Sequence, residues 1–252
     1  MPATSKPRTL AIDIGGTGLK AAVLDPQGEM VSDRVRVETE YPLPPDRLVD
    51  ALVALVEPLA PYDRVSAGFP GMVRSGRVLS APHFETVAGP GTKISKDYQH
   101  QWRGFDLASA LADRLGHPTK VVNDADMQGL AVIARKGLEM VITLGTGFGT
   151  ALFHDGRLAP HLEIAHHPFR KGETYNEQLG NLARKAVGDE RWNARVAIAI
   201  DTLQALTFFD RLYIGGGNAK KLEIGLPDDV AIVSNTAGII GGIRLWDDAS
   251  GV

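Results

Sequence analysis

Cysteine is absent from this sequence of 252 residues, and its absence excludes several kinds of protein. A chain without cysteine cannot be a disulfide-stabilised scaffold, use a thiol nucleophile or hold a metal through thiolates. Long hydrophobic runs are absent too, since none reaches the ~18 residues of a membrane helix. The polar stretch from Met1 to Arg8 is too short for a signal peptide. We therefore expect a soluble cytoplasmic protein with no membrane partner.

A large net charge is also absent. The chain has 27 basic and 30 acidic side chains, which leaves a net charge of -3. A charge this small gives no long-range field that would attract nucleic acid or an anionic membrane, so we expect neither among its partners. The 44% of apolar residues and 23% of charged residues are typical of globular proteins, and the length suits one large domain or two modest ones.

Glycine is abundant, with 28 residues, or about 11% of the chain against roughly 7% in an average protein. Two glycine clusters lie in similar segments, residues 12–24 and 142–153. Each segment follows the order strand, Gly-Thr-Gly turn, strand, turn, strand. The copies lie about 129 residues apart, a spacing that indicates one duplicated domain rather than a solenoid. We therefore predict an α/β protein with two lobes, residues 1–120 and 121–235, and a ligand-binding cleft between them.

Hydrophobic periodicity and turn residues predict the secondary structure. The predicted strands are 9–14, 19–24, 30–37, 65–69, 120–122, 141–144, 150–153, 157–162, 213–214 and 230–233. The predicted helices are about 47–57, 107–115, 125–136, 176–187, 189–209 and 236–246. Residues 70–103 are rich in Gly, Pro and Ser and predict a long loop with short pieces of structure. Loops of that length inside a globular chain are usually functional.

The two glycine turns have the composition of an anion site. Glycine lets a phosphate approach the main chain closely, and consecutive N–H groups form a cradle for it. The first turn contains Gly15, Gly16, Thr17 and Gly18; the second contains Gly145, Thr146 and Gly147. The hydroxyl of either threonine can donate a further hydrogen bond. The alternative is a pair of tight hairpins with structural roles only.

Two charged residues flank the first turn. Asp13 ends the preceding strand, and its carboxylate cannot itself hold a phosphate because both are negative. Its position is explained if Mg²⁺, or the water shell of Mg²⁺, lies between them. Lys20 could neutralise a phosphoryl group in transfer.

Asn123 and Asp124 end a predicted strand and open a helix. A carboxylate there could accept a proton from a substrate hydroxyl, as phosphoryl transfer to an alcohol requires. Plain helix capping by Asp124 is the alternative.

Glu163 and His166, three residues apart, could present a carboxylate and an imidazole to sugar hydroxyls. They could instead be ordinary surface polarity, or His161, His166 and His167 could bind a metal, although no metal motif is present.

A further glycine cluster follows a predicted strand late in the chain. Gly215, Gly216 and Gly217, followed by Asn218, suggest close packing of a flat group such as adenine, or the entry to a helix.

Taken together, these segments resemble the sugar kinases of the ROK family, and within it the polyphosphate glucokinase branch. ROK kinases share a superfamily with actin, hexokinase and the heat-shock chaperone ATPases. The similar segments are 12–20, 123–126 with 129–131, 144–152 and 213–221. The resemblance implies a ribonuclease-H-like fold in both lobes, with the last helix (236–252) packed back on the first lobe. It also implies glucokinase-like phosphoryl transfer to a sugar hydroxyl with Mg²⁺.

The resemblance also implies roles for individual residues. Asp124 would be the catalytic base and Asn123 a sugar ligand beside it, and Asp13 would hold the metal through water. The two glycine turns and residues 215–217 would bind the donor. Glu163 and His166 fall where the family has Glu-x-Gly-His, although Ala165 replaces the glycine. Residues 68–71 resemble the glycine-proline loop beneath the sugar, which makes Gly71 a sugar-binding residue.

Two departures from the family leave alternatives open. The zinc-binding Cys motif of many members is absent, as in the polyphosphate branch. Family members also carry a sugar-binding Asn four or five residues before a Trp, whereas Asp97 and Tyr98 precede Trp102 here, so the identity of the sugar stays open. A non-catalytic sensor of the same fold and an actin-like ATPase scaffold are the rival interpretations. A homodimer is expected from the family alone.

The phosphoryl donor is open as well. Polyphosphate would need a basic track beyond the second phosphate, whereas ATP needs an adenine slot near Gly216. The basic residues available for such a track are Arg184, Lys185, Arg191, Lys220 and Lys221. Solvated helix faces explain these residues equally well, so both donors are kept.

Overall fold

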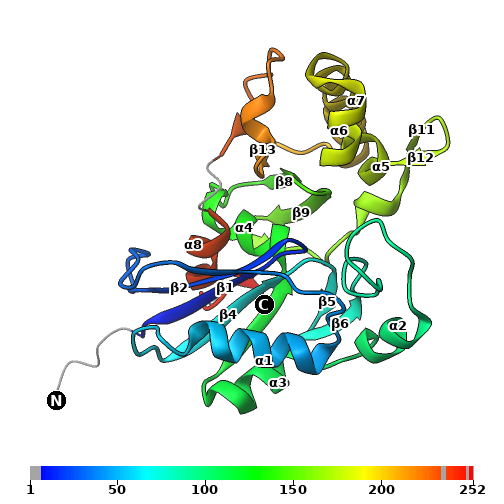
Figure 1. The fold of residues 1–252 in the computed structure, drawn as a ribbon. Helices are drawn as coiled ribbons and strands as arrows, with labels where there is room; N and C mark the ends of the chain where they lie inside the picture. Colours follow the sequence, from blue (N-terminus) through cyan, green and yellow to red (C-terminus); the bar gives the residue numbers. More distant parts are fainter. Residues whose placement is uncertain (1–6, 234–236, 248–249, 252) are drawn as a thin grey trace. The chain divides into compact units, whose positions relative to one another are not determined.

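A computed structural model describes residues 7–233, 237–247 and 250–251, and they divide into two compact units (Figure 1). Unit 1 extends to Ala131 and includes the segment that starts at Gly238. Unit 2 runs from Val132 to Ala237. The division falls later than residue 120, where the sequence placed it, because the helix after residue 123 groups with unit 1. None of the helices in the described part of the chain has the length and apolarity needed to cross a bilayer.

Unit 1 is built on a five-stranded mixed sheet. Its strands, in spatial order, are β3 (Val35–Glu38), β2 (Gly18–Leu24), β1 (Thr9–Ile14), β4 (Arg64–Phe69) and β7 (Thr119–Asn123). The pairs β3–β2 and β2–β1 are antiparallel, whereas β1–β4 and β4–β7 are parallel. Helices α1 (Pro45–Val56) and α3 (Leu107–Leu115) lie on one side of this sheet, and α8 (Ala237–Arg244) lies on the other (Figure 1).

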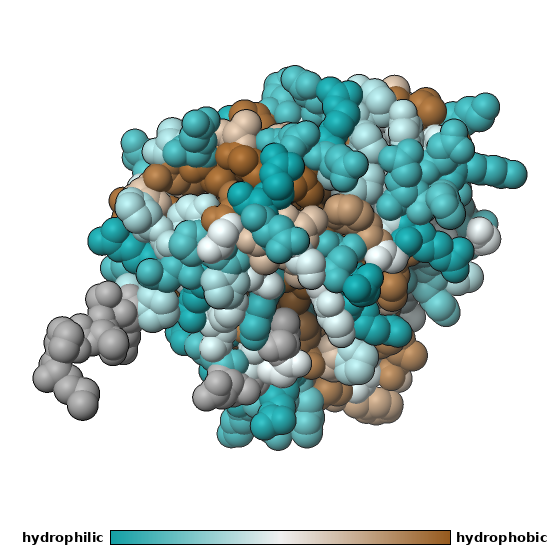
Figure 2. All heavy atoms as spheres, turned by 90° about the horizontal axis from the view of Figure 1, so that it is seen from below, coloured by the Kyte–Doolittle hydropathy of each residue, from teal (hydrophilic) through white to brown (hydrophobic). Residues whose placement is uncertain are grey.

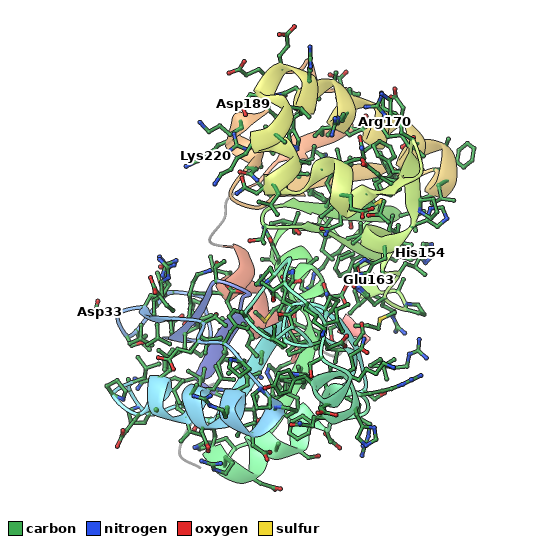
Figure 3. All side chains as sticks on the ribbon, turned by 45° about the vertical axis from the view of Figure 1, so that its right-hand side comes forward. Asp33, His154, Glu163, Arg170, Asp189 and Lys220 are labelled. Carbon is green, nitrogen blue, oxygen red and sulfur yellow. The ribbon has the colours of Figure 1, made fainter. Side chains whose placement is uncertain are left out.

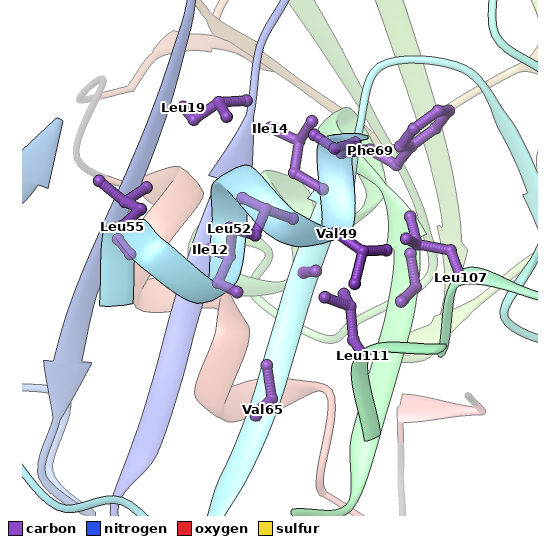
Figure 4. Packing of buried hydrophobic residues seen from close by; sticks show 14 of the residues in the cluster. Ile12, Ile14, Leu19, Val49, Leu52, Leu55, Val65, Phe69, Leu107 and Leu111 are labelled. Carbon is purple, nitrogen blue, oxygen red and sulfur yellow. The ribbon is translucent and has the colours of Figure 1, made fainter. Parts of the chain in front are cut away.

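The alternation of residues along β1 explains this layering. Leu10, Ile12 and Ile14 point to the face covered by α1 and α3, where they join the main core of the unit (Figure 4). Ala11, between them, points to the opposite face. Side chains along a strand alternate between the two faces of a sheet, so the continuous apolar run of residues 10–12 in β1 is buried on both faces.

Helix α8 is fixed to the second face by polar as well as apolar contacts. Ser66 Oγ on β4 donates a 2.6 Å hydrogen bond to the Gly242 carbonyl oxygen and accepts a 2.8 Å bond from Trp246 Nε1. Lys120 Nζ on β7 donates to the Leu245 carbonyl at 2.9 Å. Ile239 and Ile243 pack on the small side chains of β1 and β2.

The segment 70–103, predicted as a loop, contains more structure than expected. It includes the hairpin β5 (Met72–Arg74) and β6 (Arg77–Ser80) and helix α2 (Lys96–Trp102). Its buried Phe84 and Trp102 have ring centroids 5.6 Å apart, and both rings also contact Phe69. Tertiary packing of these rings orders a stretch whose local pattern is weak.

Unit 2 repeats the sheet of unit 1. Its strands, in spatial order, are β10 (Arg157–Leu158), β9 (Phe148–His154), β8 (Leu138–Leu144), β13 (Arg211–Gly215) and β14 (Val230–Ile232). The first two pairs are antiparallel and the last two are parallel, as in unit 1. The same strand order in both halves confirms the predicted α/β fold of two similar units.

The other elements of unit 2 are mainly helices that follow the hairpin. They are the 3-10 turns η1 (Ile164–His166) and η2 (Ala219–Lys221), the short strands β11 (Pro168–Arg170) and β12 (Glu173–Thr174), and helices α5 (Tyr175–Leu179), α6 (Asn181–Val187) and α7 (Asp189–Thr207). The predicted helix 176–187 is therefore two helices, because Gly180 between them has an extended backbone.

Further predictions of element bounds were wrong, including the predicted strand 157–162, which is ordered only as β10. The predicted strand 30–37 is ordered as β3 only from Val35, with an isolated bridge at Met30. Helix α4 (Asp124–Val132) is shorter than the predicted 125–136. It ends because the buried Glu139 accepts hydrogen bonds from the main-chain N–H groups of Ala134 and Lys136, which holds that stretch as a turn. The predicted last helix, 236–246, starts at Ala237, and residue 236 lies outside the described residues.

Candidate active site

The candidate residues of unit 1 lie at one edge of its sheet. Because β1, β4 and β7 are parallel, their carboxyl ends meet at the same edge, where ligands of α/β sheets usually bind. Asp13 on β1 pairs with Gly68 on β4, and Gly68 pairs with Val122 on β7. The turn of residues 15–18 (the first turn), the loop of residues 68–71 and the β7–α4 junction therefore lie side by side.

The first turn is flanked by an ion pair. Lys20 Nζ lies 2.7 Å from Asp13 Oδ2, and the two side chains are 32% and 26% exposed. The residues face each other in the antiparallel register of β1 and β2. The antiparallel register of the hairpin therefore brings the two side chains together, although the motif suggested that Asp13 faces Mg²⁺ and that Lys20 faces the phosphoryl group.

Three residues from outside the motif contact the first turn. Thr39 Oγ donates to the Gly15 carbonyl oxygen and the Tyr41 hydroxyl donates to the Gly16 carbonyl oxygen, each at 2.7 Å. A Cβ at Gly16 would lie 2.8 Å from His83 Nδ1, so the imidazole packs directly on this glycine. Sequence reasoning missed all three, and no local pattern reveals them, because they lie 24 or more residues along the chain.

Asn123 and Asp124 form the β7–α4 junction. The buried Asn123 donates from Nδ2 to the Gly71 carbonyl at 3.0 Å and accepts at Oδ1 from the Ala125 N–H at 2.8 Å. Its amide therefore fixes the loop of residues 68–71 to the start of α4. Asp124, the first residue of α4, is half-buried, and its Oδ1 accepts from the Ala125 N–H at 2.9 Å. A Cβ at Gly68 would lie 3.2 Å from the Cα of Asp124, so the two strand ends are closely packed.

The turn of residues 145–147 (the second turn) joins β8 to β9 in unit 2. The N–H of Asn181, the first residue of α6, is shared between the carbonyl oxygens of Gly145 and Thr146 at 3.1 and 3.2 Å. Asn218 Nδ2 also donates to the Gly145 carbonyl at 3.1 Å. The Thr146 side chain is exposed, like that of Thr17 in the first turn.

Helix α5 contacts the second turn through the side chain of Asn176. Thr174 and Glu177 form a capping box that starts α5, and hydrogen bonds from the Thr174 main chain and side chain lower the pKa of the Glu177 carboxyl. The helix presents Asn176, whose Oδ1 accepts a 3.0 Å hydrogen bond from the Phe148 N–H at the end of the turn. The Thr-x-x-Glu spacing of this capping box is the local sequence signal for the start of the helix.

The glycine cluster at the end of β13 also packs against the second turn. Gly215 is the last residue of β13 and pairs with Thr143. Gly216 has a φ of +87°, and a Cβ there would overlap the Leu144 main chain, so glycine is required. The Asn218 N–H donates to the Leu144 carbonyl at 2.8 Å. The cluster 215–217 therefore packs on the base of the second turn.

Glu163 and His166 lie at η1 of unit 2 but do not pair in the structure. Glu163 Oε2 instead lies 3.8 Å from Nε2 of His161, whose side chain is 5% exposed, and the His166 side chain is exposed. In Figure 3, Glu163 lies on a different side of unit 2 from Asp189 and Lys220. Lys220 and Lys221 are exposed on η2, whereas Arg184 is bound to Asp189 and to Asn181 Oδ1.

The donor set at the first turn suits a metal that arrives with a phosphate. Among the described residues, no group of three or more His, Asp or Glu side chains could hold a metal ion by itself. Mg²⁺ is usually bound by one or two carboxylates together with waters and substrate phosphates. Asp13, partly exposed and beside a main-chain cradle, fits that mode.

Asp97 and Tyr98, which precede Trp102, are in the first turn of α2. The Tyr98 N–H is capped by the Ser95 side chain, and Asp97 is exposed. Trp102 is buried, and its indole N–H donates to the Leu43 carbonyl at 3.1 Å.

An open groove of about 710 Å³ between the ends of α1 and α3 is a separate feature, since none of the predicted site residues lines it. The side of the molecule in Figure 2 exposes apolar atoms among hydrophilic ones.

The chain matches a known family and several characterised relatives. The model of the ROK family matches residues 9–163. The polyphosphate glucokinase of Mycobacterium tuberculosis is 26% identical over 257 residues, covering 95% of this chain and 91% of that protein. The N-acetylmannosamine kinase of Citrobacter koseri is 39% identical over 160 residues, covering 60% of this chain and 49% of that protein.

Solved structures are similar over almost the whole chain. The inorganic polyphosphate/ATP-glucomannokinase of Arthrobacter sp. strain KM has a TM-score of 0.79 and 30% identity, covering 94% of this chain and 97% of that one. A glucokinase from Streptomyces griseus, solved with glucose and AMPPNP, has a TM-score of 0.67 and 20% identity, covering 94% and 98%.

Proposed function

The chain belongs to the ROK family, and we propose that it transfers a phosphoryl group from ATP or polyphosphate to a hydroxyl of a sugar. The observation that carries this proposal is the shared edge of the unit 1 sheet, where a main-chain cradle, a carboxylate–lysine pair and the carboxylate of Asp124 follow parallel strands. Phosphoryl transfer depends mainly on positioning and on electrostatic stabilisation, which such an edge can supply.

The donor phosphates bind to the two glycine turns in this proposal. In the first turn, the N–H groups that follow Gly15 and the Thr17 hydroxyl donate to phosphate oxygens, while the Gly15 N–H closes the turn by donating to the Gly18 carbonyl oxygen at 3.1 Å. In the second turn, the N–H groups of Thr146 and Gly147 do the same, supported by residues 215–217, while the Gly145 N–H donates to the Gly147 carbonyl oxygen at 3.0 Å. Lys20, released from Asp13 or shared with it, adds positive charge beside the transferring group. The cradle of either turn suits ATP and polyphosphate alike, because both present a chain of phosphates.

Asp13 would hold Mg²⁺ through water beside the donor. The metal would neutralise charge on the phosphate oxygens during transfer. The chain's own contribution is to keep the Asp13 carboxylate at the edge of the sheet, where Lys20 fixes one of its oxygens at 2.7 Å.

Asp124 would accept the proton of the attacking sugar hydroxyl. Its place at the end of β7 puts the carboxylate next to the loop of residues 68–71, which Asn123 fixes through Gly71. Asn123, Gly71, Glu163 and His166 would bind the sugar. Because the amide of Asn123 already bonds to the main chain, we assign it to shaping the loop as well as to contacting the ligand.

A coupled assay that crosses two donors with several acceptors tests the reaction. ATP and polyphosphate are each offered with hexoses, N-acetylated aminosugars and polyols at a fixed Mg²⁺ concentration. Turnover with a sugar supports the proposal and identifies acceptor and donor. Sugar binding without turnover for any donor would overturn it in favour of a sensor of the same fold. Sedimentation of the same sample tests the homodimer expected from the family.

Replacing Asp124 tests the base directly. Asp124→Asn should lower kcat by roughly 10²-fold or more, because the substituted amide cannot take the proton. Donor KM and thermal stability should change little. Asp113→Asn, an exposed substitution on α3, is the matched control and should behave like wild type. Turnover near the wild-type level in Asp124→Asn would refute the role.

A further inference from the structure

The carbonyl oxygens of the first turn do not point freely to solvent. Two consecutive carbonyls, those of Gly15 and Gly16, each accept a hydrogen bond of 2.7 Å from a side-chain hydroxyl. The donors are Thr39 and Tyr41, which follow β3 and lie 24 and 25 residues further along the chain. A turn of glycines has many accessible conformations, so two fixed carbonyls restrict it strongly.

These two hydrogen bonds determine where the neighbouring N–H groups point. In a planar trans peptide the C=O and the following N–H point in opposite directions. A hydroxyl that holds the Gly15 carbonyl therefore turns the Gly16 N–H away from itself, and a hydroxyl on the Gly16 carbonyl does the same for the Thr17 N–H. Two successive N–H groups are thus directed to the side opposite Thr39 and Tyr41, which is what an anion cradle requires.

The second turn supports this interpretation because it uses the same device with different donors. Its first two carbonyls, those of Gly145 and Thr146, are held by the N–H of Asn181, and the Asn218 amide adds a bond to Gly145. Main-chain and amide donors in unit 2 thus occupy the role that two hydroxyls have in unit 1.

We propose that Thr39 and Tyr41 are positioning residues for the phosphoryl donor, which hold the main-chain N–H groups of the first turn in the orientation that binds phosphate. The inference rests on the proposed function of this turn and adds two residues from outside its motif. Neither residue needs to touch the donor, because each acts through a peptide group of the turn.

The surroundings of Tyr41 favour a hydroxyl that stays protonated and can always donate its hydrogen bond to the turn. Its ring lies 3.1 Å from the position of a Cβ on Gly89 and 6.2 Å, centroid to centroid, from Phe84. Burial raises the pKa of the Tyr41 hydroxyl to about 12, so the group keeps its proton at any pH at which a kinase is assayed.

Four variants test the proposal: Tyr41→Phe, Thr39→Val, Thr39→Ser and the double variant Tyr41→Phe/Thr39→Val. Each of the first two removes one hydroxyl and should raise the donor KM about fivefold, the value of one ordinary hydrogen bond. Thr39→Ser keeps the hydroxyl and should restore the wild-type KM. The double variant should show the largest increase. Sugar KM and thermal stability should change little, and Tyr62→Phe, a substitution outside the turn, is the control.

Binding measurements separate this proposal from the assignment of kinase activity. Calorimetry with AMPPNP and with tripolyphosphate reports on the turn even if no acceptor sugar has been found. If the wild-type protein binds neither probe, the proposed function itself fails, and this inference fails with it. If the wild type binds and the variants bind equally well, the inference alone is overturned. Equal losses for sugar and donor together with a lower Tm would also overturn it, because they indicate a purely structural role.

Discussion

The two glycine turns share a backbone design but differ in charge. Asp13 and Lys20 face each other across the first hairpin, whereas the corresponding pair in the second hairpin is Thr143 and Gly149. The sheets around them have the same strand order and directions. Both units therefore have a glycine turn, and the carboxylate–lysine pair lies beside the first turn. Under the proposed function, the metal and the transferring phosphoryl group are accordingly assigned to the first turn, and the second turn serves only to bind the donor.

The turns also differ in length and in support. Ile14 pairs with Leu19 across the first turn and Leu144 with Phe148 across the second, so the second turn is one residue shorter. Hydroxyls of distant residues brace the longer turn, whereas the start of α6 and the amides of Asn176 and Asn218 brace the shorter one. The two turns are thus held by different kinds of partner.

The largest effect is expected where the turns differ in charge. Asp13→Asn should lower kcat by roughly 10²- to 10³-fold, because it removes a preorganised charge that acts on the transferring group. Thr143→Val, the change at the corresponding position of unit 2, should leave kcat close to wild type. Steady-state kinetics at saturating sugar checks both. Similar losses of kcat in the two variants would contradict the assignment of different roles to the two turns.

A smaller effect is expected from a methyl group in either turn. Nothing in the described residues lies within 4 Å of a Cβ at Gly145, so Gly145→Ala should not change the Tm. It should still raise the donor KM by roughly tenfold to a hundredfold if a phosphate approaches there, because small misplacements of substrate are costly. Gly16→Ala should lower the Tm as well, because the methyl group would meet His83. An unchanged donor KM in Gly145→Ala would remove the second turn from the donor site.

The smallest effect is expected from the threonine hydroxyls. Thr146→Val removes one exposed hydroxyl and should weaken donor binding about fivefold, in line with the loss of one hydrogen bond. Thr17→Val is the matched change in unit 1, and calorimetric titration with AMPPNP measures both. Loss of affinity in one variant alone would show which threonine contacts the donor, and no loss in either would count against both contacts.

Much of the fold could be predicted because the signals were local. The repeated strand–glycine–strand segments, the stripe of α1 and the glycine at the end of α3 all depend on residues close in sequence. The order within residues 70–103 could not be predicted in this way, because Phe84 and Trp102 acquire their places by packing on Phe69. The end of α4 also depends on a distant group, the buried carboxylate of Glu139.

The residues of the candidate site also divide into those that a local motif predicted and those that only the tertiary structure brings to the site. The motif identified the glycine turns, Asp13 and the β7–α4 junction, since each is a short continuous segment. Thr39, Tyr41 and His83 were missed because their contacts with the first turn arise from tertiary structure. The pairing of Lys20 with Asp13 could have been found from the hairpin register alone, which places them opposite each other.

Helix α8 has a consequence for biosynthesis. It covers one side of the β1–β4 pair, yet the ribosome makes it only after residues 132–236, which are almost all of unit 2. In the nascent chain, Ala11, Ala22 and Ser66 therefore stay uncovered by α8 until more than a hundred further residues have been synthesised. Exposed strands of this kind are prone to aggregate during folding. Premature termination late in the message would accordingly damage the half of the enzyme that was translated first.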